Sequence, residues 1–162
     1  MAKASRLKGR NLMIFTGENG TDEDALVPLA LCTNTTVTFT AETEDEKTKD
    51  DSIAANPEVT STSWEATSEM LYAYDGGDIQ LVTTELVEMF NAAAQVPVII
   101  GIPTNKSDGD VPDAGWTVPA STEGSMSGTA IITSLEIDAP VEGKATCSIT
   151  FTGVGSLSLI TE

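Results

Sequence analysis

The last stretch of the chain places the strongest constraint on its fold. Over residues 128–160, two runs of near-alternating polar and apolar residues flank a turn-forming segment at 140–144. This pattern predicts a long antiparallel hairpin with one buried face. In the second run Cys147, Ile149 and Phe151 share the core-facing parity. The opposite parity carries short hydroxyl groups where a solvated face more often carries Lys or Arg, which indicates a face with a special role.

A second hairpin is predicted in the first half of the chain. Residues 36–44 alternate cleanly between Thr and apolar side chains, behind Asn34 as a turn residue, and residues 58–67 form the return strand. Trp64 is the expected core anchor of this hairpin. The connection, residues 44–58, is dense in charge and predicts a long solvated loop.

Shorter elements are predicted for the rest of the chain. They are strands over residues 12–15, 26–31, 96–102 and 116–120, and a helix over residues 84–94. Leu86, Met89 and Phe90 fall at helical spacing behind Thr83, the candidate N-cap. The expected role of this helix is to pack across one side of a sandwich. Pro97 predicts that its strand begins at a sheet edge.

Charge is the most unusual property of the composition. The sequence has 25 acidic and 8 basic residues, a formal net charge of -17. Four of the basic residues lie in the first ten positions, where no acid occurs, so residues 11–162 hold 4 basic and 25 acidic groups. A folded body of this charge lacks the basic stripe of a nucleic-acid binder, which disfavours binding of a DNA duplex.

Motifs for catalysis and for cofactors are weak. The sequence has no histidine, which excludes Ser-His-Asp, Cys-His and His-ligated zinc sites. The acidic loop over 108–113 lacks the glycine and terminal Glu of an EF-hand, and Gly153 with Gly155 opens no phosphate-binding helix. Glu42 and Glu65 could pair across a hairpin as glycosidase carboxylates do. We expect no catalytic residue, no metal site and no cofactor.

Targeting signals are also weak. The apolar run after the basic N-terminus is shorter than the roughly 7 residues of the briefest signal-peptide core, and no stretch reaches the roughly 18 apolar residues of a membrane helix. Cys32 and Cys147 are expected to be reduced. These features predict a protein that is made in the cytoplasm and does not enter a membrane.

In each of four predicted strands, every second residue is polar, and these residues would share one face of the strand. These residues are Thr36, Thr38, Thr40 and Glu42; Ser61, Ser63 and Glu65; Ser134 and Glu136; and Ser148 and Thr150, with Thr152 beyond them. The parity is least secure at residues 130–132. If copies of the chain close into a ring, these faces could join into one wall of hydroxyls and carboxylates that repels phosphates. The alternative is a solvated face of a free sandwich.

The two hairpins resemble the major tail tube proteins of long-tailed bacteriophages and prophages. The pattern G-x-A-x-I-T-S-L begins at Gly128, and A-T-x-S-x-x-F-x-G-x-G-x-L runs to Leu157. Further upstream, the segment 28–33, the Thr-rich strand after it and the Ser63-Trp64 strand resemble the first hairpin of the same family. The resemblance covers most of residues 26–160.

The resemblance implies a mainly β fold, an antiparallel β-sandwich or barrel with one flanking helix. It implies a basic arm over 1–11 and one domain over 12–162. Copies are expected to form stacked hexameric rings around a lumen that DNA traverses without being bound. The arm and the 44–58 loop would supply the contacts between rings. These residues are Lys3, Arg6, Lys8, Arg10, Glu44, Asp45, Glu46, Lys47, Lys49, Asp50 and Asp51.

Tape-measure, tail-tip and tail-terminator proteins are the other expected partners, in a virion tail assembled in the cytoplasm of a bacterial host. Three alternatives stay open at this stage. One is the tube of a contractile tail or injection system. The others, from different classes, are a free immunoglobulin-like binding module and a carboxylate-dependent hydrolase.

Overall fold

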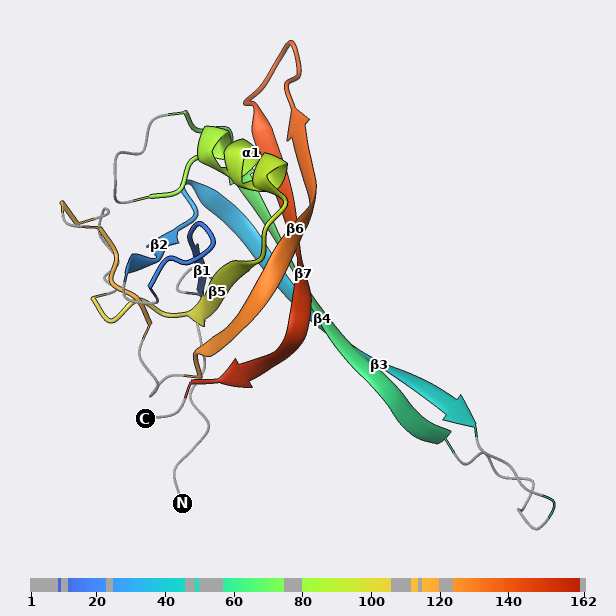
Figure 1. Cartoon of the computed structure of the whole chain (residues 1–162). Coiled ribbons are helices and arrows are strands. Elements are labelled where there is room, and N and C mark those ends of the chain that lie inside the picture. The colour runs from blue at the N-terminus through green and yellow to red at the C-terminus, as the bar shows by residue number, and fades with distance from the viewer. Residues whose placement is uncertain are drawn as a thin grey trace.

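One antiparallel seven-stranded sheet and one helix organise the computed structural model of the chain (Figure 1). The structure describes residues 9, 12–22, 25–45, 49, 57–74, 80–105, 112–113, 115–119 and 124–160. The elements are β1 (Met13–Thr16), β2 (Val27–Pro28), β3 (Cys32–Asp45), β4 (Pro57–Leu71), α1 (Thr83–Ala92), β5 (Val96–Gly101), β6 (Met126–Asp138) and β7 (Thr146–Leu159). The strand order is β2-β1-β5-β6-β7-β4-β3.

The sheet curls so that its two halves share one core. Ile14 of β1 and Ile100 of β5 belong to the same buried cluster as Ala66 of β4 and Phe151 of β7. The mainly β fold with one helix is therefore confirmed, and the two layers of the predicted sandwich are two halves of one continuous sheet. Sheets of this many strands twist and curl in this way to bury their apolar faces.

Helix α1 closes one side of this core, one residue away from its predicted start. Leu86 and Met89 are buried as the helical spacing requires. The prediction that Thr83 caps the helix is wrong, because the N-cap is Val82, whose N–H donates to Glu85 Oε2 at 3.0 Å. Thr83 is instead a buried residue of the first turn, and its hydroxyl accepts a hydrogen bond from the N–H of Ala73 at 3.2 Å.

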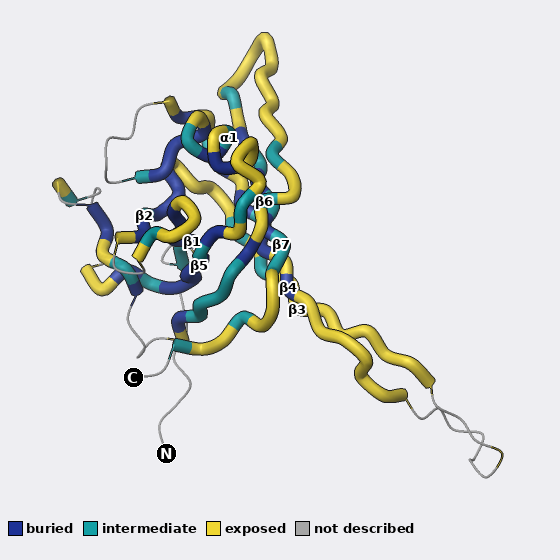
Figure 2. The backbone as a smooth tube through the Cα atoms, viewed as in Figure 1, coloured by how far each residue is buried: buried dark blue, intermediate teal, exposed yellow. Residues whose placement is uncertain are grey.

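Strands β3 and β4 are longer than predicted, mainly at their inner ends, and their outer ends extend well beyond the body. From Trp64 to the end of β4 every second residue is buried, whereas all residues from Pro57 to Ser63 are exposed. Figures 1 and 2 show this outer part as a two-stranded arm that projects from the body with exposed residues along it. Asn34, predicted as a turn, lies inside β3 beside a bulge.

Two of the shorter predictions are corrected by the structure, and a third, that the strand of Pro97 begins at a sheet edge, is confirmed. The strand predicted over 26–31 is reduced to β2, and Leu31 has a positive φ of 51°. Residues 116–119 form no strand, although Trp116 is buried against Phe15. Strand β5 is interior, but its pairing with β1 begins only at Val98, so Pro97 has a neighbouring strand on one side only.

The C-terminal hairpin is confirmed and contains a bulge that explains its ambiguous parity. Ile132 pairs with Phe151 and Ser134 pairs with Thr150, so Thr133 is an extra residue in β6. Such a bulge changes which sequence parity faces the core. Ile132 packs against the core before the bulge, and Leu135 packs against it afterwards.

Candidate assembly surfaces

All eleven residues predicted to line a lumen lie on one face of the four strands β6, β7, β4 and β3. The strand registers place Thr36, Thr67, Thr150 and Ser134 in one row across these strands. We call this the polar face. Its residues are Asn34, Thr36, Thr38, Thr40 and Glu42 of β3; Ser61, Ser63, Glu65, Thr67, Glu69 and Leu71 of β4; Thr146, Ser148, Thr150 and Thr152 of β7; and Ile131, Ser134, Glu136 and Asp138 of β6. The face points away from the core.

The sequence reasoning missed part of this face. Thr67 and Glu69 belong to it, because β4 continues to Leu71 with the same alternation. The signal was present in Ala66, Ser68 and Met70, which continue the buried parity. Ser68 concealed it, since a buried hydroxyl breaks the apolar pattern; its Oγ lies 3.2 Å from the carbonyl oxygen of Asn34, to which it donates.

The polar face is anionic. It presents the carboxylates of Glu42, Glu65, Glu69, Glu136 and Asp138, and no Lys or Arg belongs to it among the residues that the structure describes. The carboxylate of Glu42 accepts a hydrogen bond from Ser61 at 3.2 Å. The predicted pairing of Glu42 with Glu65 is wrong: Glu42 pairs with Ser61, four residues from Glu65, which separates the two by about 13 Å along the strand.

The residues predicted for contacts between rings are only partly described. Glu44 and Asp45 are exposed at the outer end of β3, and Lys49 is exposed beyond it. The other predicted contact residues lie outside the described residues. They are Lys3, Arg6, Lys8, Arg10, Glu46, Lys47, Asp50 and Asp51.

Besides the outer edge of the two-residue β2 and the edge of β4 before Glu65, two long strand edges have no neighbouring strand in the described part of the chain. Strand β3 is the last in the sheet, so no strand of the described chain lies along its outer edge. Strand β6 pairs with β5 only as far as Ala130, which leaves residues 131–138 with β7 alone as a neighbour. Unpaired edges of this length are sites where another chain adds strands.

Large apolar side chains are exposed at these same two edges. Phe39 of β3 pairs directly with Trp64, so it lies on the core side of the sheet, yet it is 59% exposed. Ile137 of β6 pairs with the buried Cys147 on that same side and is 46% exposed. The core side of the sheet therefore continues past the body as an uncovered apolar surface, which is typical of an interface.

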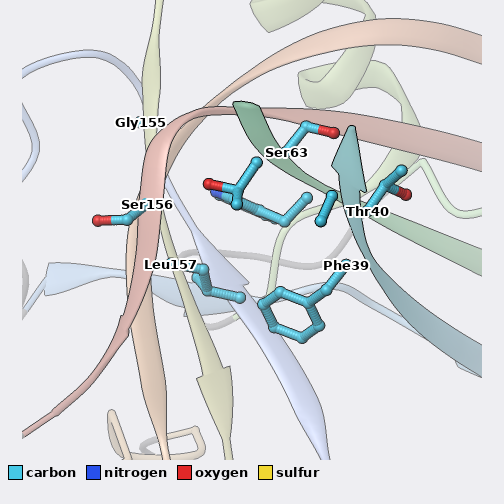
Figure 3. Close-up of a pocket in the computed structure, with 9 residues that line it drawn as sticks. Phe39, Thr40, Ser63, Gly155, Ser156 and Leu157 are labelled. Atoms are coloured by element: carbon cyan, nitrogen blue, oxygen red, sulfur yellow. The ribbon is translucent and has the colours of Figure 1, made fainter. Parts of the chain in front are cut away.

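A pocket of about 280 Å³ lies where the projecting arm leaves the body (Figure 3). Phe39 and Leu157 point toward each other across it, while Ser156 points away. Trp64 forms part of its lining, and the pocket surface is mostly apolar. It holds no cluster of polar groups that would fix a small ligand.

Gly153 and Gly155, which form no phosphate-binding loop, have a role in packing. A Cβ atom built on Gly153 would overlap the indole ring of Trp64, so the ring lies flat against the backbone of β7. Gly155 has a positive φ of 76°, a conformation that favours glycine, where β7 bends beside the pocket. Both residues thus shape the root of the arm.

Chemically reactive groups are few. Among the described residues there is no group of His, Cys, Asp and Glu that could hold a metal ion, and no helix long and apolar enough to cross a membrane. Both cysteines are free thiols. Burial raises the pKa of the Cys147 thiol, and a hydrogen bond with Thr83 opposes that shift.

Solved structures of tail proteins share this fold, although no protein-family model and no curated protein matches the sequence. The tail of an empty gene transfer agent particle, with C6 symmetry, has a TM-score of 0.67 at 18% identity, over 96% of this chain and 100% of that chain. The SPP1 tail tube has a TM-score of 0.68 at 10% identity, over 95% of this chain and 79% of that chain. The anti-feeding prophage baseplate has a TM-score of 0.55 at 9% identity, over 96% of this chain and 95% of that chain. The tail tube-like fold is confirmed.

Proposed function

We propose that this chain is the repeating structural subunit of a phage-type tail tube, which assembles with copies of itself into stacked hexameric rings. The observation that carries the proposal is the agreement of fold, over nearly the whole chain, with a tail of C6 symmetry and with the SPP1 tail tube. The unpaired edges of β3 and β6 support it, because ring closure buries both.

The topology suits such a closure. The strands β6, β7, β4 and β3 are each antiparallel to the next, so they alternate in direction. Because their number is even, β3 of one copy is antiparallel to β6 of the next copy. Six copies then give a closed antiparallel barrel of roughly 24 strands, with no edge left in the ring.

The polar face would line the bore of this barrel. With strands about 4.8 Å apart and tilted by about 35–45°, the backbone diameter is roughly 45–50 Å, which is wide enough for a DNA duplex. Hydroxyls keep the wall hydrated, and the carboxylates of Glu42, Glu65, Glu69 and Glu136 repel phosphates. The mechanism is therefore geometric: the wall guides DNA without holding it.

Other parts of the chain would link rings and partners. The segment over residues 1–10 carries four basic and no acidic groups, so it is attracted to the acidic surface of a copy in the adjacent ring. The connection over 44–58 is the second contact between rings. The tube would have no catalytic role, and its ends would meet tape-measure, tail-tip and tail-terminator proteins in a virion tail.

Electron microscopy of the purified, concentrated protein tests the proposal. Negative stain should show rings and hollow rods. If it shows only small monomers at every concentration and salt condition, the protein is a free binding module and the proposal fails. Removal of residues 2–10 should weaken stacking, and the difference from the full chain should shrink as salt screens the charges.

A further inference from the structure

We infer that the interface between neighbouring copies in a ring has one defined strand register, in which Thr38 of β3 lies opposite Glu136 of β6 in the next copy. The inference rests on the proposed function and deepens it. It assigns the exposed apolar residues of both edges to a common interface, with Phe39 opposite Leu135 of the next copy. The two faces of the sheet, the tilt of a closed barrel, the ends of β3 and the positions of the carboxylates determine this register in four steps.

The two faces of the sheet restrict the possible registers first. On β3, the residues with even numbers from Thr36 to Glu42 belong to the polar face. On β6 beyond the bulge, Ser134 and Glu136 belong to it as well. Only pairings of even with even residues keep the polar face continuous, because a slip of one residue turns every side chain over. This condition leaves registers that differ by two residues.

The tilt of a barrel then limits the offset between copies. Within one copy, Thr36 and Ser134 occupy the same row across the four strands. Four strands span about 19 Å, so a tilt of about 35–45° displaces the next copy by about 13–19 Å along the strands, or about four to six residues. An offset of two residues gives a tilt of only about 20°, below this range.

The ends of β3 determine the direction of the offset. An offset of four residues toward the outer end of β3 places Ser134 of the next copy opposite Thr40, within the strand. The same offset in the other direction places it opposite Cys32, the first residue of the strand, and leaves Glu136 without a partner strand. The next copy therefore pairs with the middle of β3, from Thr36 to the root of the projecting arm.

The carboxylates distinguish four residues from six. With an offset of four, Glu136 lies opposite Thr38 and diagonal to Thr36 and Thr40, so no carboxylate is its neighbour. With an offset of six, Glu136 becomes diagonal to Glu42 at about 7–8 Å, within reach of a like charge. The acidic residues of the two edges thus favour the offset of four.

The core side of the sheet is compatible with the same register. It places Phe39 opposite Leu135 of the next copy and Val37 opposite Ile137, two apolar pairs in succession. Phe39 is also diagonal to Ile137, and diagonal neighbours are within reach of an aromatic side chain. The large side chains that are 59% and 46% exposed in one copy, Phe39 and Ile137, would cover each other in the ring.

Cysteine cross-linking of assembled tubes tests the register. Cys32→Ser first removes the exposed thiol, and the buried Cys147 is kept. In this background Thr38→Cys/Glu136→Cys should form a ladder of disulfide-linked multimers on a non-reducing gel after mild oxidation. Directly opposed residues lie about 4.5–5.5 Å apart between Cα atoms, within disulfide range, whereas diagonal residues lie beyond about 7 Å.

Matched pairs separate the alternatives. Thr36→Cys/Glu136→Cys reports an offset of two residues and Thr40→Cys/Glu136→Cys an offset of six, and neither should form the ladder; single-cysteine variants should form none. A ladder in either alternative pair overturns the register. Tubes without a ladder in any pair overturn the edge pairing but leave the proposed function standing. Wild-type protein that forms neither rings nor tubes overturns the proposed function itself.

A charge test keeps the register falsifiable if a cysteine pair prevents assembly. Thr38→Glu places a second carboxylate opposite Glu136 and should raise the protein concentration needed for assembly several-fold, because like charges directly opposite destabilise strand pairing. Adding Glu136→Gln should restore assembly, whereas adding Glu69→Gln, which removes a carboxylate of the same face that pairs with Asn34 and not with position 38, should restore less. Equal rescue by both changes would contradict the register.

Discussion

Trp64 and Phe39 stand directly opposite each other on the same side of one hairpin, and their surroundings differ completely. Trp64 is 3% exposed, between the body and the backbone of Gly153, whereas Phe39 is 59% exposed at the root of the projecting arm. The alternation of side chains is the same on both strands. The difference teaches that one copy of the chain supplies the cover for Trp64 but not for Phe39, and that the second cover must come from another molecule.

The largest effect should follow from removing the buried member of this pair. Trp64→Ala should lower the free energy of unfolding by about 3–5 kcal/mol, because a large buried side chain is lost and a cavity remains. Phe39→Ala should change it by less than about 0.5 kcal/mol when the protein is too dilute to assemble. Urea unfolding curves measure both values. Equal losses in the two variants would break the comparison.

The backbone against which Trp64 packs gives the next effect. Gly153→Ala adds a Cβ that overlaps the indole and should lower the free energy of unfolding by about 1–3 kcal/mol. Ser156→Ala, an exposed change on the same strand, is the control and should have little effect. In a Trp64→Ala background the Gly153→Ala penalty should largely disappear, because the two side chains compete for one space. If the losses of unfolding free energy in the two single variants simply add in the double variant, the two side chains do not compete for that space.

The exposed member of the pair should matter for assembly. Phe39→Ala should raise the concentration at which light scattering detects tubes by about tenfold, equivalent to about 1.4 kcal/mol at an interface. Val141→Ala, an even more exposed apolar residue in the β6–β7 turn, is the matched control and should leave that concentration unchanged. If both variants assemble like the wild type, the arm is not covered by another copy.

The polar face can be separated from both aromatic residues by reversing its charge. A variant with Glu42→Lys, Glu65→Lys and Glu136→Lys should fold with nearly unchanged stability, since all three side chains are exposed. It should retain short DNA duplexes in sedimentation at low salt and release them as salt rises, whereas the wild type should not retain them. Retention of DNA by the wild type would contradict a repelling wall.

The smallest effect concerns the buried thiol beneath α1. Because burial raises the pKa of Cys147 in the folded state, the unfolded chain loses this proton at lower pH than the folded chain. The thiol therefore leaves stability unchanged below the ordinary pKa that it has in the unfolded chain and lowers stability as pH rises above that pKa. The decline in unfolding free energy at alkaline pH should be less steep in Cys147→Ala. The same slope in both proteins would contradict the shift.

The sequence predicts the elements whose pattern is local. The β6–β7 hairpin and the burial of Trp64 follow from alternation alone, and α1 follows from helical spacing. Pro97 correctly predicted that β5 begins at an edge, but the sequence did not reveal that β1 pairs with it from Val98 onward and makes the rest of the strand interior. Such long-range pairing leaves no mark in a short window of sequence.

The sequence predicts which kinds of residue form the candidate surfaces, but it does not predict how far each surface extends over the folded chain. The polar parity of Thr36 or Ser148 is visible in the sequence, whereas the exposure of Phe39 is not, because its apolar character predicts burial. Whether a core-side residue is covered depends on where the body ends, a property of the folded chain. Similarly, the register across four strands required the bulge at Thr133 to be located, and Ile131, Ile132 and Thr133 alone do not reveal it.

That bulge also gives β6 a tolerance to changes in length. The extra residue is not needed to keep Glu136 on the outer face, because loss of Thr133 or Ser134 would restore simple pairing without turning the rest of the strand over. One residue added after Ser134 would instead direct Glu136 toward the core, unless the ladder distorted again. Homologous chains should therefore shorten this strand by a single residue more readily than they lengthen it.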